Sequence, residues 1–417
     1  MIRRPRDEIR FLAEGKSMTE TGSHYPMPPI TKPALGEPYL LTPGPLTTSE
    51  NVKKAMLRDW GSRDGDFQHM TAEIRRRILA MTGDVANEYD CVPIQGSGTF
   101  AVEAMIGAFA PKDRKTLVLV NGAYGKRIAQ ILDCLGRPAI VLDKGDYIPP
   151  RAEEVSDILK ADSEITHVVV VHCETSSGIL NPIKEISEVV YANGAKLLVD
   201  SMSAFGAIPL DVRDVRYDAM VSSANKCIEG VPGFGFVVAR KTELEASKGV
   251  SHSLSLDVHA QWANMNKTGQ WRFTPPTHVL AAFLEALMIH EAEGGVEGRG
   301  NRYRRNCDVL VTGMRKLGFE TLLHDEWMAP VIVTFFNPAH PKFDFEVFYD
   351  LLNQRGFVIY PGKLTVVDSF RMGCIGWLDE AVMKSVVDVV ADVLSQMGID
   401  NGAPSEAAMQ ERSKLAA

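Results

Sequence analysis

The chain has 417 residues, of which 45% are hydrophobic and 24% charged, with 34 glycines and 23 prolines. This composition is ordinary for a globular protein of two or three domains, and it excludes collagen-like and mostly disordered chains. The formal net charge is -8, from 45 basic and 53 acidic residues. Because the basic residues form no block, nucleic acid is excluded as the main partner and a small molecule is expected instead.

No run of residues approaches the roughly 18 apolar positions of a membrane helix. The first residues are basic but include Asp7, Glu8 and Glu14 and contain no apolar segment, so neither a secretory nor an organellar signal is predicted and the cytoplasm is expected. The cysteines are far apart, without a CxxC pair or zinc spacing, so we expect reduced core thiols and no metal site. They are Cys91, Cys134, Cys173, Cys227, Cys307 and Cys374.

Residues 1–38 show no sustained periodicity and predict an irregular extension. From Tyr39 onwards, apolar runs alternate with helical periods, which is typical of an α/β domain with a mainly parallel sheet flanked by helices. Strands buried on both faces are predicted at Thr116 to Val120, His167 to His172, Lys196 to Val199, Asp218 to Ser222 and Phe234 to Ala239. Helices are predicted at Thr99 to Phe109, Gly125 to Leu135, Ile183 to Asn193 and Pro276 to Glu293.

The later part of the chain predicts a smaller α+β domain. A long charged helix is expected at Gly298 to Leu317, and the last helix at Asp379 to Met397. Between them, strands are expected at Pro330 to Phe336, Gly356 to Tyr360 and Phe370 to Ile375. The expected division is a large domain over residues 39–290, whose residues 39–60 lie near the small domain or the active site, and a small domain over 291–398. Residues 399–417 are small and polar and predict a mobile tail.

A glycine-rich turn follows a predicted strand and opens a helix at residues 95–99. Its glycines let the backbone approach an anion, and the amides at the helix start, with the hydroxyls of Ser97 and Thr99, can hold a phosphate. The same residues match a dinucleotide fingerprint, but the next strand ends in Asn121 and Gly122 without the acidic residue that would bind a ribose. Taken alone, the segment is equally compatible with a plain strand-to-helix turn.

Two charged residues end buried strands. Asp200 follows Lys196 to Val199, where ligands of open α/β sheets bind, although it could simply cap the next turn. Lys226 follows Asp218 to Ser222 among small residues, which can desolvate the amine and leave it nucleophilic, whereas most lysines are solvated surface residues. Together with the glycine-rich turn, these residues are the fixed points of a pyridoxal phosphate site.

Six segments resemble the 2-aminoethylphosphonate:pyruvate transaminases, a group of class V, fold-type I pyridoxal phosphate enzymes. They are Leu41 to Ser49, Gln95 to Thr99, Asn121 to Gly125, Val199 to Ser203, Ser222 to Gly233 and Trp271 to Thr274. The resemblance covers about residues 39–395. It implies a fold-type I domain, a homodimer with active sites at the subunit interface, and pyridoxal 5′-phosphate as cofactor. It also implies transfer of the amino group of 2-aminoethylphosphonate to pyruvate, giving phosphonoacetaldehyde and L-alanine.

The resemblance also implies roles for individual residues. Lys226 would hold the cofactor covalently and Asp200 would pair with its ring nitrogen. The remaining cofactor-binding residues would be Ser97, Gly98, Thr99 and Asn225 at the phosphate, Thr274 of the second subunit at the same phosphate, Tyr124 on the ring face and Thr175 at the ring hydroxyl. The substrate-binding residues would be Arg371, which matches an anion-binding arginine, together with Gly44 and Arg63.

Three positions depart from the family pattern: Arg63, His259 and Cys374. Arg63 is a candidate for an extra cation at the phosphonate, and Arg371 could instead be a surface ion pair. An alanine:glyoxylate or serine-type class V aminotransferase would share every cofactor residue and is the nearest alternative. A nicotinamide-dependent dehydrogenase would explain the glycine-rich turn but not Asp200 and Lys226 together.

Overall fold

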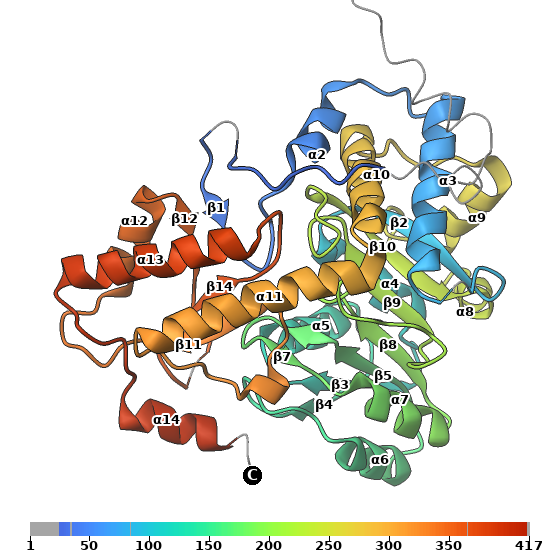
Figure 1. Cartoon of the computed structure of the whole chain (residues 1–417). Helices are drawn as coiled ribbons and strands as arrows, with labels where there is room; N and C mark the ends of the chain where they lie inside the picture. The colour runs from blue at the N-terminus through green and yellow to red at the C-terminus, as the bar shows by residue number, and fades with distance from the viewer. Residues whose placement is uncertain (1–24, 34–35, 84, 365, 415–417) are drawn as a thin grey trace, which may run out of the picture.

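The computed structural model describes residues 25–33, 36–83, 85–364 and 366–414. Its centre is a seven-stranded sheet in the order β2-β10-β9-β8-β5-β3-β4 (Figure 1). The neighbouring pairs among β9, β8, β5, β3 and β4 are parallel, while β10 runs antiparallel to both β2 and β9. The strands are β2 (Tyr89–Gly96), β3 (Lys115–Val120), β4 (Ala139–Asp143), β5 (Ile165–Val171), β8 (Lys196–Asp200), β9 (Ala219–Ser223) and β10 (Gly233–Arg240). The predicted fold class, a mainly parallel sheet flanked by helices, is therefore confirmed.

Successive side chains of the central strands pack into two different cores. Leu117 and Leu119 of β3 belong to one core and Val118 and Val120 to the other, as the two-residue period of a strand requires. The first core is completed by α3 (Gly65–Ala80), α6 (Ala152–Ala161), α7 (Ile183–Ala192) and α10 (Thr277–Ala292), and the second by α4 (Gly98–Phe109) and α5 (Ala123–Cys134). Helices thus cover both faces, which explains why the strands are continuously apolar.

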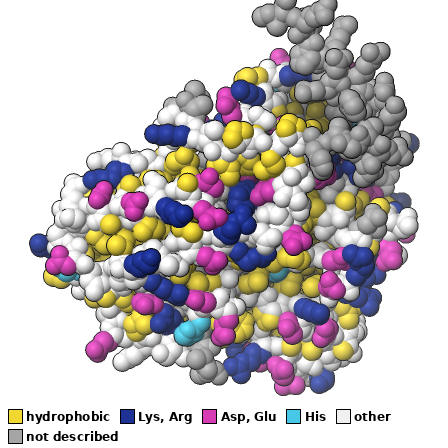
Figure 2. Space-filling view, in the orientation of Figure 1, with side chains coloured by type: hydrophobic (Ala, Val, Ile, Leu, Met, Phe, Trp, Pro, Cys, Tyr) yellow, Lys and Arg dark blue, Asp and Glu magenta, His cyan; other side chains and the backbone are white. Residues whose placement is uncertain are grey.

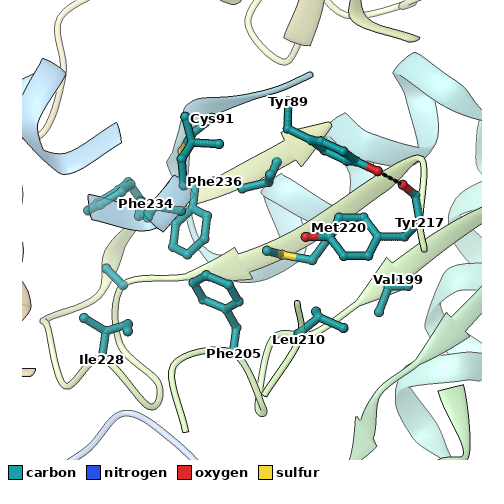
Figure 3. Packing of buried hydrophobic residues seen from close by; sticks show 14 of the residues in the cluster. Tyr89, Cys91, Val199, Phe205, Leu210, Tyr217, Met220, Ile228, Phe234 and Phe236 are labelled. Carbon is teal, nitrogen blue, oxygen red and sulfur yellow. Dashed lines mark hydrogen bonds between the residues drawn. The ribbon is translucent and has the colours of Figure 1, made fainter. Parts of the chain in front are cut away.

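Aromatic side chains fill the first core beneath β10. Phe234 and Phe283 meet edge to face with ring centroids 4.9 Å apart, and Phe205 meets Phe236 at 5.6 Å. The Tyr89 hydroxyl donates a 2.6 Å hydrogen bond to the carbonyl of Tyr217, so its polar end is satisfied (Figure 3). Such packing makes the sheet a rigid base for the segments that leave its edge.

The C-terminal part forms a second layered unit with its own core. The antiparallel sheet β11-β14-β13 joins β11 (Ile332–Phe336), β14 (Ser369–Gly373) and β13 (Tyr360–Pro361). The surrounding helices are α11 (Gly295–Lys316), α12 (Phe345–Gln354) and α13 (Glu380–Met397). The short strand β1 (Tyr39–Leu40) pairs in parallel with β12 (Phe357–Val358), and the rings of Tyr39 and Phe357 stack 5.7 Å apart. Residues from both ends of the chain therefore build this unit.

The remaining elements are short or peripheral. They are α2 (Glu50–Lys54), the 3-10 helix η1 (Ala55–Leu57), β6 (Cys173–Glu174), β7 (Ile179–Leu180), α8 (Lys241–Ala246), α9 (Val258–Thr268) and η2 (Asp325–Trp327). All six cysteines are free, and all except Cys134 are buried. Lys, Arg, Asp and Glu side chains are interspersed on the face shown in Figure 2, in agreement with the absence of a basic block in the sequence. Within the described residues, no helix is both long and apolar enough to cross a bilayer.

The two ends of the chain differ in how far the structure tests the sequence-based predictions. Of the extension predicted over 1–38, residues 1–24, 34 and 35 lie outside the described residues. The segment after residue 398, predicted to be a mobile tail, contains a helix, α14 (Glu406–Ser413), which is capped by Ser405. The Tyr147 hydroxyl bonds to Glu411, and Arg412 forms a 2.9 Å ion pair with Glu320. The helix therefore contacts both the large domain and the C-terminal unit, while the mobility of the tail stays a prediction.

Candidate active site

The predicted site residues follow strands that end at one edge of the central sheet. The parallel strands β3, β5, β8 and β9 end at Val120, Val171, Asp200 and Ser223, and β2 ends at Gly96 beside them. The carboxyl edge of such a sheet is where ligands bind, because the connecting segments diverge there. The sheet therefore brings together segments that are up to 130 residues apart in the sequence.

Lys226 lies three residues beyond β9, against the backbone of the loop that follows β1. Its Nζ donates a 2.6 Å hydrogen bond to the carbonyl of Pro43. The next residue, Gly44, has φ = 115°, and a Cβ there would lie 2.8 Å from both Nζ and Cδ of Lys226. Only glycine permits this approach. Burial lowers the pKa of Lys226, which increases the fraction of neutral, nucleophilic amine.

Asp200 is a buried carboxyl with a perturbed pKa. Its side chain is 4% exposed, and Oδ1 accepts a 2.9 Å hydrogen bond from the backbone N–H of Met202. Burial raises the pKa of Asp200 to about 6, and the neighbouring Glu174 acts in the same direction, whereas Arg127 and Lys226 oppose it. A protonated ring nitrogen beside this carboxyl would stabilise its charged form, and the charged carboxyl would in turn keep the nitrogen protonated.

Thr175 has a buried hydroxyl that lacks a partner. The residue is fully buried, and Oγ1 makes no hydrogen bond within the described chain. Its carbonyl accepts a 2.7 Å hydrogen bond from Nη1 of Arg371, so the backbone position is fixed. Because an unsatisfied buried hydroxyl is costly, it fits a ligand oxygen such as the ring hydroxyl of pyridoxal phosphate.

Arg371 lies on β14 and is 1% exposed. Its Nε donates a 3.0 Å hydrogen bond to the carbonyl of Pro361, and with the bond to Thr175 this uses two of its five N–H donors. No carboxylate of the described residues forms an ion pair with it, whereas the buried Arg299 and Arg302 are each paired with Glu293. Burial lowers the pKa of Arg371. The alternative of a surface ion pair is wrong, because this guanidinium is buried and unpaired.

The glycine-rich turn lies beside the segment that carries Asp200. Ser97 is the N-cap of α4 but forms no side-chain cap hydrogen bond, which leaves its hydroxyl available. A Cβ at Gly98 would come within 2.6 Å of Sδ of Met202, so this position excludes any larger residue without displacement. The Thr99 hydroxyl accepts a 3.1 Å hydrogen bond from Nη1 of Arg127. Helix amides, two hydroxyls and a guanidinium together form a suitable phosphate site.

The sequence analysis missed two residues that shape this edge, Glu174 and Arg127. Glu174 is fully buried, and its Oε2 accepts hydrogen bonds from the N–H groups of Tyr124 at 3.0 Å and Gly125 at 3.2 Å. It therefore fixes the start of α5 beside its own neighbour Thr175. Arg127 lies three residues after Tyr124 on the same helix, with Cζ 4.9 Å from that ring. The helical spacing was a usable signal for Arg127, since residues i and i+3 share a face.

Other predicted residues have weaker links to this edge. Asn225 accepts a 3.1 Å hydrogen bond from Ser223 through Oδ1. The carbonyl of Thr274 accepts a bond from Gln95, just before the glycine-rich turn, while the Thr274 side chain is exposed. Arg63 is exposed in the loop before α3 and forms no hydrogen bond or ion pair with other predicted site residues in the described chain.

Two of the departures from the family pattern have structural partners. His259 Nδ1 lies 2.7 Å from the carbonyl of Leu244, and its ring meets Trp262 edge to face at 5.8 Å. Cys374 is fully buried in the core of the C-terminal unit, together with Cys307. Both side chains therefore have packing roles that do not require a substrate.

The loop after Lys226 is anchored by a buried ionic cluster from α11 and the segment before it. Nη1 of Arg299 and the hydroxyl of Tyr303 both donate to the carbonyl of Cys227. Nη2 of Arg302 forms a 2.8 Å ion pair with Glu229, which has φ = 64°. Because Cys227 directly follows the lysine, this cluster fixes the backbone from which the amine projects.

A surface hollow of about 390 Å³ lies elsewhere, lined by residues of α3, α10 and the start of α11. Its cations already have partners, since Arg77 is paired with Glu73 and Glu291, and Arg213 with Asp211. Because these two arginines are already paired with carboxylates, we do not expect the hollow to bind an anion. The carboxyl edge of the central sheet, where Lys226 lies and where Arg371 contacts Thr175, is therefore the better candidate for an active site.

Known proteins share both the sequence and the fold. The family model described as aminotransferase class-V matches residues 48–372. The 2-aminoethylphosphonate--pyruvate transaminase of Rhizobium meliloti (strain 1021) is 70% identical over 383 residues, which cover 92% of this chain and 100% of that protein. The 2-aminoethylphosphonate--pyruvate transaminase 1 of Paraburkholderia xenovorans (strain LB400) is 64% identical over 385 residues, covering 92% and 99%.

Among solved structures, a ureidoglycine-glyoxylate aminotransferase from Bacillus subtilis has a TM-score of 0.80 at 21% identity, covering 93% of this chain and 99% of that one. At that identity, the likeness shows the fold alone. The match to the class V family model and the two relatives at 70% and 64% identity show the family as well. The chain belongs to the class V aminotransferases and, within them, to the 2-aminoethylphosphonate--pyruvate transaminase family.

Proposed function

We propose that the protein binds pyridoxal 5′-phosphate and transfers the amino group of 2-aminoethylphosphonate to pyruvate, giving phosphonoacetaldehyde and L-alanine. The observation that carries the proposal is the buried, unpaired guanidinium of Arg371, fixed to the backbone of Thr175. A planar fork without an internal partner suits a carboxylate or a phosphonate. The names of relatives that are 70% and 64% identical support this pair of substrates.

The residues at the sheet edge fit the cofactor. Ser97, Gly98 and Thr99 would hold its phosphate, with Asn225 nearby, and the unpartnered hydroxyl of Thr175 would meet the ring hydroxyl. Tyr124 would lie against the ring, and Asp200 would accept a hydrogen bond from the ring nitrogen. The bound cofactor supplies an aldehyde that takes up the amine and a ring that withdraws electrons.

The protein's own groups would supply positioning and proton transfer. Because burial lowers its pKa, the amine of Lys226 is a suitable base for the proton on the carbon that bears the substrate amino group. The carbonyl of Pro43 holds that amine at 2.6 Å and fixes its direction. Arg371 would hold the anionic end of each substrate in turn and would thereby place the reacting carbon near Lys226.

We further propose that two subunits complete each site. Thr274 is exposed, and Phe273 beside it is 45% exposed, on the segment expected to reach the partner's phosphate. The cofactor should then stabilise the dimer, because a ligand held by two chains is lost when they separate. Sedimentation of the protein with and without cofactor over a dilution series tests this. A fully active monomer would contradict it.

The experiment that tests the function is a donor and acceptor screen on the purified protein. 2-Aminoethylphosphonate, alanine and serine are each combined with pyruvate or glyoxylate, and Lys226→Ala prepared in parallel measures activity from contaminants. We expect the highest kcat/KM for 2-aminoethylphosphonate with pyruvate. Turnover of alanine with glyoxylate, or of serine, in preference to the phosphonate would favour the alternative class V aminotransferases.

A further inference from the structure

A phosphonate places a heavier electrostatic demand on the site than a carboxylate does. A carboxylate carries one negative charge, whereas a phosphonate, like a phosphate monoester, carries up to two near neutral pH. One guanidinium can pair with either group, but the second charge calls for another cation or several more donors. Arg371 is the buried cation of the substrate end, and Arg63 makes no contact with it in the described chain. The structure does place another cation beside Tyr124, two residues after a hydrogen-bond partner of Arg371.

That cation is Lys363, in the loop between β13 and β14. Its Nζ lies 5.3 Å from the centroid of the Tyr124 ring, and the side chain is exposed to solvent. Two residues earlier, at the end of β13, the carbonyl of Pro361 accepts the 3.0 Å hydrogen bond from Nε of Arg371. The backbone from Pro361 to Lys363 therefore connects Lys363 to a direct partner of Arg371. Among the described residues, no carboxylate forms an ion pair with Lys363, so its charge is available.

Two cations lie beside the Tyr124 ring. Arg127 lies 4.9 Å from the ring centroid and donates to the hydroxyl of Thr99, in the segment proposed for the cofactor phosphate. Lys363 lies 5.3 Å from the same centroid, two residues after Pro361, which accepts the hydrogen bond from Arg371. The ring is thus shared by a cation that contacts the proposed phosphate segment and a cation whose neighbouring strand contacts Arg371.

We propose that Lys363 provides the second positive charge that recognises the dianionic phosphonate, and so determines the preference for an aminophosphonate over an amino acid of similar size. This inference rests on the proposed function. The ammonium of Lys363 and the guanidinium of Arg371 together balance two negative charges. The carboxylate of pyruvate or alanine is satisfied by Arg371 alone, which explains how one site serves both half-reactions.

The test compares the two half-reactions of the holoenzyme by stopped-flow absorbance. Lys363→Met removes the charge and keeps an unbranched side chain, and Lys363→Arg restores the charge. We expect Lys363→Met to slow the reaction with 2-aminoethylphosphonate by about tenfold or more, as for loss of a charge-assisted contact, and the reaction with alanine by less than about twofold. Lys363→Arg should retain most of the phosphonate rate. Lys112→Met, at an exposed lysine between α4 and β3, controls for the surface substitution.

Equal losses in both half-reactions, or no loss in the phosphonate half-reaction, would overturn this role for Lys363. Failure of the proposed function has a different signature, since the wild-type enzyme would then react with alanine but not with 2-aminoethylphosphonate. The cofactor absorbance and the far-ultraviolet circular dichroism of each variant show whether the fold and the loaded site remain intact.

Discussion

Replacing Asp200 with Asn should stabilise the cofactor-free protein, although it removes the charge that we propose pairs with the ring nitrogen of the cofactor. Burial raises the pKa of this carboxyl from 3.8 to about 6. A difference of that size corresponds to about 3 kcal/mol of unfavourable free energy for the ionised form in the folded state. Asn has nearly the same shape and can still accept the hydrogen bond from Met202. Above pH 6, we therefore expect the Asp200→Asn apoprotein to unfold with a free energy up to about 3 kcal/mol larger than that of the wild type.

The sign of the pH dependence follows from the raised pKa. Below the unfolded-state value of 3.8, the carboxyl is protonated in both states and contributes no difference. As the pH rises to about 6, the carboxyl of Asp200 loses its proton in the unfolded chain before it does so in the folded protein. The free energy of unfolding of the wild type therefore falls over this range, whereas the asparagine of the variant does not titrate and gives it no such decrease. Urea unfolding of both apoproteins between about pH 4 and pH 8 measures this difference.

A matched control is Asp325→Asn, because Asp325 is 67% exposed and Arg315 lowers its pKa. That substitution should have a small effect of the opposite sign. With cofactor bound, the Asp200→Asn variant should be less stable than the wild type instead of more stable. Its transamination rate should fall by about a thousandfold or more, because the ring nitrogen would lose its charged partner. If the Asp200→Asn and wild-type apoproteins unfold at the same urea concentration at every pH, Asp200 does not bear the cost of burial described above.

Two further substitutions test the amine and the anion site. Lys226→Ala should fold, lose turnover and form no borohydride-trapped adduct with pyridoxal phosphate, as read by mass spectrometry; an adduct at wild-type stoichiometry would refute the assignment. Arg371→Ala should weaken transition-state binding in both half-reactions by about 2 to 4 kcal/mol, measured as kcat/KM for each. Loss in only one half-reaction would show that the two anions do not share this arginine.

The sequence predicts the central strands well, because strands buried on both faces are continuously apolar. β4 is not among the predicted strands, although Ala139 to Leu142 are all apolar. It is an edge strand in which exposed and half-buried residues alternate, and Val141 is 46% exposed. The antiparallel direction of β10 also escapes prediction. Its apolar residues resemble those of its parallel neighbours, and only the pairing with β2 and β9 reveals its direction.

The position of Asp200, Lys226 and the glycine-rich turn at one sheet edge could be predicted, because each signal is local, a polar or small residue at the end of an apolar run. The contacts of Glu174 and Lys363 could not be predicted, because both involve Tyr124, which is distant in the sequence. Glu174 is 50 residues from Tyr124, and Lys363 is further away still. The sequence also cannot show whether an arginine is paired. For Arg371, that fact separates an anion site from a structural ion pair.

The charge balance of the site explains why an anionic substrate is needed at all. The molecule carries a net charge of -8, so its long-range field opposes the approach of an anion. Around the proposed site the balance is reversed, because the two carboxylates Asp200 and Glu174 are outnumbered by three cations. These are Arg127, Lys363 and Arg371. Burying Arg371 without a partner is unfavourable in the free protein, and an incoming carboxylate or phosphonate removes that cost. The positive charge of Arg371 therefore has no ionic partner in the free protein, and pairing with the anion of the substrate contributes favourably to binding.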